Sequence, residues 1–275
     1  MKIRGKKVLV TGAASGIGRC TALAMAKAGG KLILTDINEL GLAETVSMAR
    51  KQGGAVLASK ALDISDLASV QELADEVHRD FGPMDVLCNI AGIALFAQVE
   101  DMEHSHWEKI LAVNLWGVIH AVECFVPEMI RARSGHLVNV ASLAGLAGLP
   151  WHAAYSASKH AVVGLSESLS FDLRKHGIHV TLVCPGAVAT PLVESVRILA
   201  DPALVAKSKP LFLKAAVTPE KVAELTLRAV ERNRFLVLTS PDIHALYLLK
   251  RQAPRTFRGA MRVMSRAMDK ALGKR

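Results

Sequence analysis

Two residues four positions apart, Tyr155 and Lys159 in the segment YSASK, could carry proton-transfer chemistry. On a helix, positions i and i+4 share a face, so the phenol would lie beside the ammonium group. A tyrosine with an ordinary pKa of ~10 is a poor proton acceptor at neutral pH, and a neighbouring cation stabilises its phenolate. The pair predicts general acid–base catalysis, although such pairs are common on surface helices and mean little alone.

A glycine-rich segment near the N-terminus, TGAASGIG, could bind a phosphate group. Gly12, Gly16 and Gly18 permit a tight turn and a close backbone approach, and a helix after them offers unpaired N–H groups to a pyrophosphate. The next apolar run, KLILTD, ends at Asp36. A carboxylate at that place accepts hydrogen bonds from the ribose hydroxyls of NAD and repels the 2′-phosphate of NADP.

Both the interpretation of the loop and the choice of cofactor have an alternative. The loop could be a turn that only packs a helix on a strand, but Asp36 at the end of the second strand argues against this interpretation. NAD is the preferred cofactor, and NADP stays possible because Arg19 and Lys31 lie close enough in sequence to pair with a phosphate.

The elements that must position these residues follow from the periodicity of the chain. Apolar runs alternate with segments of helical period, and the helices are expected from about Gly16, after Asn38, near 66–79, at about 105–131 and at about 152–175. The expected strands are KKVLVT, KLILTD, AVLASKALD, DVLCN, HLVNVAS and HVTLVCPG, with FLVLT at 235–239 as a seventh. This alternation predicts an α/β fold with a doubly wound parallel sheet of the Rossmann type, covered by helices on both faces.

The chain of 275 residues is 51% hydrophobic, which is enough for one large domain. We expect this domain over 1–243, including a lid at about 190–217, where prolines interrupt the pattern. A basic amphipathic extension is expected at 244–275.

Several segments resemble the short-chain dehydrogenase/reductase family in order and spacing, over roughly residues 5–190. They are TGAASGIG, Asn89-Ile90-Ala91-Gly92, Asn114, Ser142, YSASK and Pro185-Gly186. The resemblance implies a catalytic tetrad of Asn114, Ser142, Tyr155 and Lys159. Ser142 would bond the substrate oxygen, Tyr155 would exchange its proton, and Asn114 would hold a water that links Lys159 to solvent.

The resemblance also implies a set of cofactor contacts. Lys159 would bond the nicotinamide ribose, the turn after Pro185 would hold the carboxamide with Thr190 alongside, and Asp63 would meet the adenine ring. The full set is Gly12, Ser15, Gly16, Ile17, Gly18, Asp36, Asp63, Ile64, Asn89, Ala91, Gly92, Tyr155, Lys159, Pro185, Gly186, Val188 and Thr190. Ile90 departs from the family, which often has an asparagine there; we expect a local packing change and no loss of catalysis.

These features predict an NAD-dependent oxidoreductase that interconverts an alcohol and a ketone or aldehyde. Apolar residues at 93–98, 143–151 and 190–217 favour an apolar substrate. The alternative is a non-catalytic NAD-binding sensor or scaffold on the same fold, which would have no need of the four catalytic residues. The resemblance further suggests a homodimer or homotetramer built through the helices at 105–131 and 152–175.

Three other groups of residues are assigned to structure first. His104 and His106 are two positions apart and do not share a helix face, so no metal site is expected. Trp107 and Trp116 fit an amphipathic pattern and are expected to pack. His152 would either border the substrate pocket or lie on the surface.

The net charge of +9 is concentrated in residues 244–275, where nine Lys/Arg face one acidic residue, Asp269. On a helix, the apolar residues Phe257, Met261, Met264, Met268 and Leu272 form one stripe, and Arg255, Arg258, Arg262, Arg266 and Lys270 lie opposite. Docking on the chain's own domain or a neighbouring subunit is favoured over peripheral contact with an anionic membrane. No nucleic-acid partner is expected, because interleaved aromatic residues are missing. An N-terminus without a long apolar region and four scattered cysteines predict a cytoplasmic protein, with membrane association left open.

Overall fold

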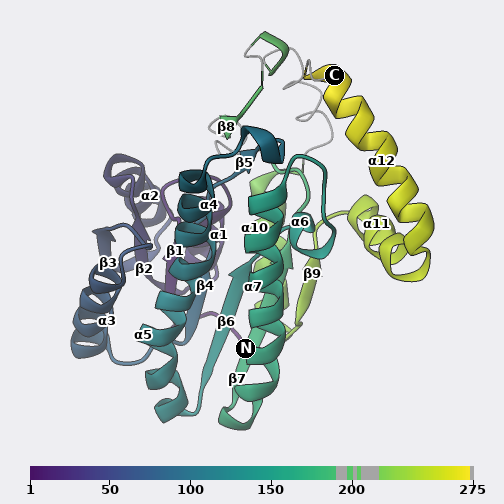
Figure 1. Cartoon of the computed structure of the whole chain (residues 1–275). Helices are drawn as coiled ribbons and strands as arrows, with labels where there is room; N and C mark the ends of the chain where they lie inside the picture. The colour runs from purple at the N-terminus through teal and green to yellow at the C-terminus, as the bar shows by residue number, and fades with distance from the viewer. Residues whose placement is uncertain (190–196, 201–202, 206–216, 273–275) are drawn as a thin grey trace.

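The centre of the molecule is a parallel sheet of seven strands, seen in the computed structural model of Figure 1. The structure describes residues 1–189, 197–200, 203–205 and 217–272. The strands, in spatial order, are β3 (Ala55–Ala61), β2 (Lys31–Asp36), β1 (Lys7–Thr11), β4 (Val86–Asn89), β6 (Gly135–Val140), β7 (Ile178–Cys184) and β9 (Leu236–Leu238). The order reverses between β1 and β4, and ligands of such sheets bind beyond the carboxyl ends of the strands at that point.

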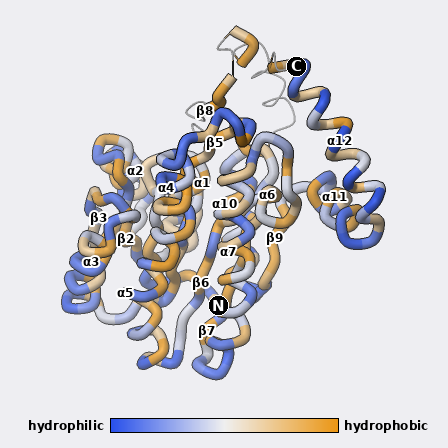
Figure 2. The backbone as a smooth tube through the Cα atoms, viewed as in Figure 1, coloured by the Kyte–Doolittle hydropathy of each residue, from blue (hydrophilic) through white to orange (hydrophobic). Residues whose placement is uncertain are grey.

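Helices cover both faces of the sheet because the side chains of each strand alternate in direction. In β1, Val8 and Val10 pack with α1 (Gly16–Lys27), α2 (Glu39–Lys51) and α10 (Pro219–Glu231). Leu9 packs on the other face, where α3 (Leu67–Phe81), α5 (Gly117–Ala132) and α7 (Ala153–Asp172) lie. Both faces are thus buried, which explains the continuous apolar strands in the sequence. Figure 2 shows hydrophobic residues concentrated in these strands.

The seven predicted strands and the doubly wound sheet are confirmed. One prediction needs correction, since the helix expected at 105–131 is interrupted. It consists of α4 (His104–Leu111), a π-helical turn η2 (Ala112–Trp116) and α5. The sequence also gave no sign of a second, two-stranded sheet of β5 (Leu95–Phe96) and β8 (Arg197–Ile198).

Three short helices lie between the longer elements: η1 (Val99–Asp101), α6 (Leu143–Leu146) and η3 (Arg174–His176). Trp107 packs against an apolar cluster as expected, but the same expectation for Trp116 is wrong, because its side chain is 52% exposed. The two histidines form a helix start: His106 accepts a hydrogen bond from the Glu103 N–H, and His104 lies beside Glu108. Most of the expected lid at 190–217 lies outside the described residues.

The helical stretch His104–Ala132 is long and apolar enough to span a membrane, but half of its most apolar window is buried inside the molecule. Its residues Val118, Ala121 and Phe125 belong to the core clusters. The stretch therefore has the burial of a core helix.

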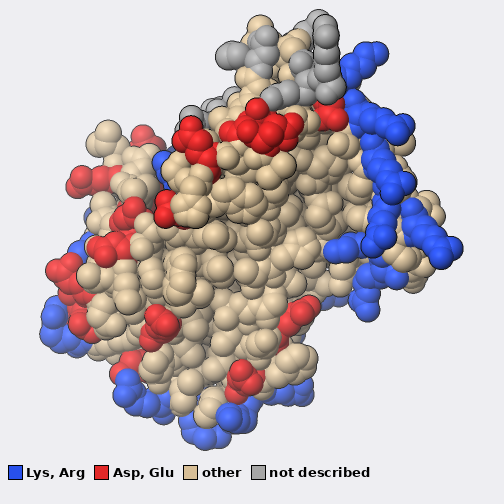
Figure 3. All heavy atoms as spheres, in the orientation of Figure 1, with Lys and Arg blue, Asp and Glu red and all other residues tan. Residues whose placement is uncertain are grey.

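The C-terminal residues form two helices, α11 (Pro241–Gln252) and α12 (Pro254–Ala271). Position 244, where the extension was expected to begin, lies inside α11. A proline at the first position of each helix explains the break, because it favours a helix start and cannot continue the previous helix. Along α12, hydrophobic and hydrophilic residues alternate (Figure 2), and Figure 3 shows Lys and Arg along the edge formed by α11 and α12.

Candidate active site

Tyr155 and Lys159 lie one turn apart in the first half of α7, on a shared face, as predicted. The Lys159 ammonium nitrogen is 5.9 Å from the centre of the Tyr155 ring. It is buried, with the residue only 4% exposed, and it donates a hydrogen bond of 3.0 Å to the carbonyl oxygen of Val140 at the end of β6. The lysine therefore ties the helix that bears the tyrosine to the centre of the sheet.

Burial governs the acid–base properties of this pair. It raises the pKa of the Tyr155 phenol, and a hydrogen bond with the Ser142 hydroxyl opposes that rise. Burial lowers the pKa of Lys159 to about 8, against its ordinary value of 10.5. Among the contacts of the chain itself, the Ser142 hydroxyl is the group that lowers the tyrosine pKa, a role that the sequence had assigned to Lys159.

Ser142 is positioned by three neighbours at the carboxyl end of β6. Its hydroxyl caps α6 by accepting from the Ala144 N–H at 3.1 Å. Its backbone N–H donates to the buried Cys184 thiol, and the Leu143 N–H donates to the Pro185 carbonyl at 2.7 Å. These contacts fix the serine between β6 and the turn that follows β7.

Asn114 sits in the π-helical turn η2 and is fully buried. Its amide group donates to the Ile93 carbonyl at 2.9 Å and to the Ser158 hydroxyl at 3.1 Å, while its oxygen accepts from the Ile93 N–H at 2.8 Å. The side chain therefore joins the loop after β4 to α7.

The missing side chain at Gly92 allows the polar ends of Asn114 and Lys159 to approach the same point. A Cβ atom at Gly92 would lie 3.1 Å from the Asn114 amide oxygen and 3.4 Å from the Lys159 ammonium nitrogen. Both polar atoms thus border the same small space beside this glycine. That is the arrangement a bound water linking Lys159 to Asn114 would need.

The glycine-rich loop has the geometry that the sequence predicts. Gly12 and Gly16 have positive φ angles of 71° and 51°, a conformation that L side chains rarely adopt. A Cβ at Gly18 would lie 1.8 Å from the Gly12 carbonyl oxygen, and one at Gly12 would lie 2.8 Å from the Ala91 backbone. Ser15 caps α1 without a side-chain bond, and Ile17 packs partly buried against the core. Only glycine permits this close approach of the start of α1 to the end of β1, which is the place where a pyrophosphate binds in folds of this type.

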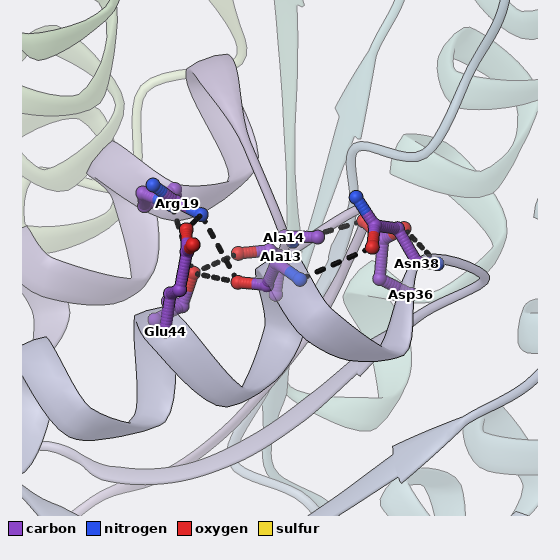
Figure 4. Close-up of polar contacts among 8 residues, drawn as sticks. Ala13, Ala14, Arg19, Asp36, Asn38 and Glu44 are labelled. Carbon is purple, nitrogen blue, oxygen red and sulfur yellow. Dashed lines mark hydrogen bonds and ion pairs between the residues drawn. The ribbon is translucent and has the colours of Figure 1, made fainter.

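Asp36 ends β2 beside the loop (Figure 4). Its two carboxylate oxygens accept hydrogen bonds of 2.9 Å, one from the Ala14 N–H and one from the Asn38 N–H. These bonds hold the carboxylate at the carboxyl end of the second strand, where the ribose of a dinucleotide binds in folds of this type.

Arg19 and Lys31, the two cations that the sequence offered as partners for the 2′-phosphate of NADP, have other positions in the structure. The Arg19 guanidinium bonds the Thr45 hydroxyl, the Gly41 carbonyl and the Glu44 carboxylate, all on α2 (Figure 4). Lys31 begins β2 and Asp36 ends it, which separates them by about 16 Å along an extended strand. Neither cation lies next to Asp36 in this arrangement.

The remaining cofactor residues are spread along the same edge of the sheet. Asp63 is exposed and accepts from the Ser65 N–H and hydroxyl, and Ile64 packs against Gly117. The Asn89 amide nitrogen donates to Asn139, and its oxygen is buried without a hydrogen-bond partner among the described residues. Such an orphaned acceptor at the end of β4 suits a site that receives a polar ligand.

The turn after β7 runs from Pro185 past Gly186, whose Cβ would touch Ile243 of α11, to Val188, which pairs with Val217. Thr190 lies outside the described residues.

Sequence reasoning missed two neighbours of the candidate site. Ser158 receives the Asn114 bond and donates to the Tyr155 carbonyl at 2.8 Å, and Cys184 lies against Ser142. No local pattern marks these two residues, because their contacts depend on packing. Phe96 belongs to the segment 93–98 that the sequence assigned to the substrate region, and it lies beside Tyr155, with 6.2 Å between ring centres. His152, left open by the sequence, lies beside both rings: its ring centre is 4.0 Å from that of Phe96 and 6.2 Å from that of Tyr155.

Comparisons with known proteins agree with this geometry. A family model described as short chain dehydrogenase matches residues 6–199. The putative oxidoreductase SadH of Mycobacterium tuberculosis is 34% identical over 255 residues, which cover 90% of each chain. The probable oxidoreductase EphD of the same organism is 33% identical over 264 residues, 93% of this chain, and this chain spans 44% of its length.

Among solved structures, a short chain dehydrogenase/reductase from Burkholderia phymatum in complex with NAD superposes with a TM-score of 0.84. It is 35% identical to this chain and covers 93% of it, and 96% of the Burkholderia chain is covered in turn. The match spans the sheet, the glycine-rich loop and the Tyr155 helix together. The protein therefore belongs to the short-chain dehydrogenase/reductase family.

Proposed function

We propose that this protein is an NAD-dependent oxidoreductase that interconverts an alcohol and a ketone or aldehyde, with Tyr155 as general acid and base. The observation that carries the proposal is the group of Tyr155, Ser142 and buried Lys159 at the carboxyl end of the sheet. The Ser142 hydroxyl forms a hydrogen bond with the Tyr155 phenol, and the buried ammonium group of Lys159 lies one helical turn from the tyrosine. A packing tyrosine would not require these partners.

The residues around the glycine-rich loop fit NAD. Gly12, Gly16 and Gly18 would lie against its pyrophosphate, and Asp36 would bond its adenosine ribose. Asp36 disfavours NADP because a 2′-phosphate would face its carboxylate, while Arg19 is held by α2. When bound, NAD supplies the redox partner for hydride transfer to or from the substrate carbon.

The chain's own residues would handle the proton and orient the substrate. In oxidation, the Tyr155 phenolate takes the proton of the alcohol hydroxyl, and the Ser142 hydroxyl holds the substrate oxygen in place. Lys159 and Asn114 border one space beside Gly92, which gives the tyrosine proton a route toward solvent through water. In reduction, Tyr155 donates the same proton to the carbonyl oxygen.

An apolar substrate is supported by the side chains near Tyr155. A cluster of Leu95, Ile110 and Ala154 packs with Ile93 and Leu199, and Phe96 lies against His152. The pKa of His152 is lowered by burial, so this histidine is neutral at pH 7 and adds no charge to the site. A pocket lined in this way favours an apolar alcohol or carbonyl compound.

We also propose a homo-oligomer in the cytoplasm. Large apolar side chains are exposed on the two helical regions expected at the interface, Trp116 at 52% and Phe171 at 77%. The four cysteines are free thiols, and three of them are buried, which suits a reducing compartment.

The first test is a fluorescence titration with NADH and NADPH, followed by a screen of apolar secondary alcohols by absorbance at 340 nm. NADH is expected to bind more tightly than NADPH, and at least one alcohol is expected to be oxidised. Tyr155→Phe is expected to bind NADH within twofold of the parent protein and to lose turnover by at least about a hundredfold. Tighter NADPH binding would contradict the role of Asp36, and binding without turnover would favour the non-catalytic sensor.

A further inference from the structure

The single acidic residue of the basic extension, Asp269, reaches across to the catalytic body. One of its carboxylate oxygens accepts two hydrogen bonds of 2.8 Å, from the Trp151 indole N–H and from the Gln98 side-chain amide. Hydrogen bonds to a charged acceptor are the strong ones among side chains. Asp269 thus joins α12 to two segments that lie more than a hundred positions earlier in the chain.

Both of these segments lead directly to Tyr155. Trp151 precedes α7, is 6% exposed, and has a positive φ of 66°, which is rare for a bulky residue and persists only where its surroundings hold it. Its carbonyl accepts from the Ala97 N–H at 2.8 Å, and Ala97 pairs with His152. The His152 ring lies 6.2 Å from that of Tyr155. Asp269 therefore holds a segment whose next residue lies against the catalytic tyrosine.

A second contact ties the extension to the other side of the site. The Lys250 ammonium of α11 donates to the Leu146 carbonyl of α6, the short helix that Ser142 caps. The extension is therefore anchored at the end of α6 by α11 and at Trp151, just before α7, by α12.

One side of α12 carries an apolar stripe. Phe257 and Leu272 at its two ends are buried, and Met261, Met264 and Met268 between them share the same side at helical spacing. These methionines are only partly buried. Methionine is flexible and polarisable, so a row of them forms an adaptable apolar surface.

We propose that α12 is the outer wall of the substrate site, that Asp269 is the positioning residue that holds it there, and that the methionine stripe receives the distal apolar part of an elongated substrate. This inference rests on the proposed oxidoreductase function. It names the substrate class more closely: an alcohol or ketone with a long hydrocarbon part beyond the reacting carbon.

The test compares Asp269→Ala with Arg262→Ala, a matched change on the exposed side of the same helix. With a long secondary alcohol such as decan-2-ol, Asp269→Ala is expected to raise KM about tenfold and to change kcat less than twofold. KM for butan-2-ol is expected to stay within threefold. Arg262→Ala should behave as the parent protein does, and Asp269→Asn, which keeps an acceptor oxygen, should recover most of the lost affinity.

A second measurement separates this inference from the proposed function. Hydrogen exchange is followed in residues 254–271 of the full chain with NADH, with and without decan-2-one. Protection by the ketone in the parent protein, lost in Asp269→Ala, supports the inference even if no alcohol is turned over. Absence of protection in the parent protein, or equal changes of KM for the long and the short alcohol in Asp269→Ala, would overturn it.

Discussion

The properties of Tyr155 depend on which groups are buried with it. Burial disfavours both the phenolate of Tyr155 and the ammonium of Lys159, so the pKa of the tyrosine rises while the pKa of the lysine falls. The Ser142 hydroxyl acts against this trend by lowering the tyrosine pKa. At the scale of single residues, the serine lowers the pKa of the phenol, and in the proposed reaction it would also orient the substrate.

This arrangement predicts a pH effect for Ser142→Ala. Loss of the hydroxyl removes a stabiliser of the phenolate, so the Tyr155 pKa rises further above its ordinary value. Oxidation requires the phenolate, so the rising limb of the kcat profile against pH should move to higher pH, with about a tenfold loss of rate per pH unit below it. Ser142→Thr keeps a hydroxyl and serves as the control. A limb that stays in place in the alanine variant would contradict the tuning role.

Among the elements, the close packing of α1 against the end of β1 requires glycine at particular positions. Gly18 lies in α1 against the Gly12 carbonyl, so the helix can approach the strand only where a Cβ is missing. The interrupted helix α4–η2–α5 is the second such junction. Its π-helical turn places Asn114 where the side chain reaches both Ile93 and Ser158, and such turns occur often at functional sites.

Gly18→Ala tests the first junction. The new Cβ would lie 1.8 Å from a carbonyl oxygen, so the loop must shift. We expect NADH affinity to fall at least tenfold and the free energy of unfolding to fall by about 1–3 kcal/mol. Gly259→Ala is the control, because that glycine is also helical and no atom of the described residues lies within 4 Å of its Cβ position. It should stabilise the protein by up to about 1 kcal/mol and leave NADH binding unchanged. Equal effects of both changes on NADH affinity would refute the close-approach argument.

The whole molecule combines a nearly neutral catalytic body with a basic extension. Residues 244–275 carry a net charge of +8, and the remaining chain therefore carries +1. Phe257 and Leu272 of α12 are buried, and Asp269 accepts hydrogen bonds from Gln98 and Trp151. These contacts dock the extension on its own chain. This is the docked arrangement that the sequence favoured, and it leaves the arginines toward solvent (Figure 3).

The exposed Phe171 of α7 tests the assembly of the whole molecule. If α7 forms a subunit interface, Phe171→Asp places a charge in it and should shift the protein to a smaller species in sedimentation velocity. Val263→Asp on α12, where the side chain is 67% exposed, should leave the assembly unchanged. An unchanged sedimentation coefficient in Phe171→Asp would exclude this end of α7 from the interface.

The sequence by itself determined the fold and most of the candidate site. Alternation of apolar runs and helical segments is local information, and so is a strand, a glycine-rich turn and a helix in succession. The structure therefore contains the features predicted from them: the seven strands, the loop at Gly12 and the face shared by Tyr155 and Lys159.

Only the tertiary structure decided how distant segments meet. Arg19 lies one residue from Gly18 in sequence, yet α2 holds it away from Asp36. Trp151 and Asp269 are 118 positions apart and share a hydrogen bond beside the active site. No periodic pattern encodes such a contact, because its formation depends on the packing of helices and on the loops between them, and both are set by the free energy of the whole fold.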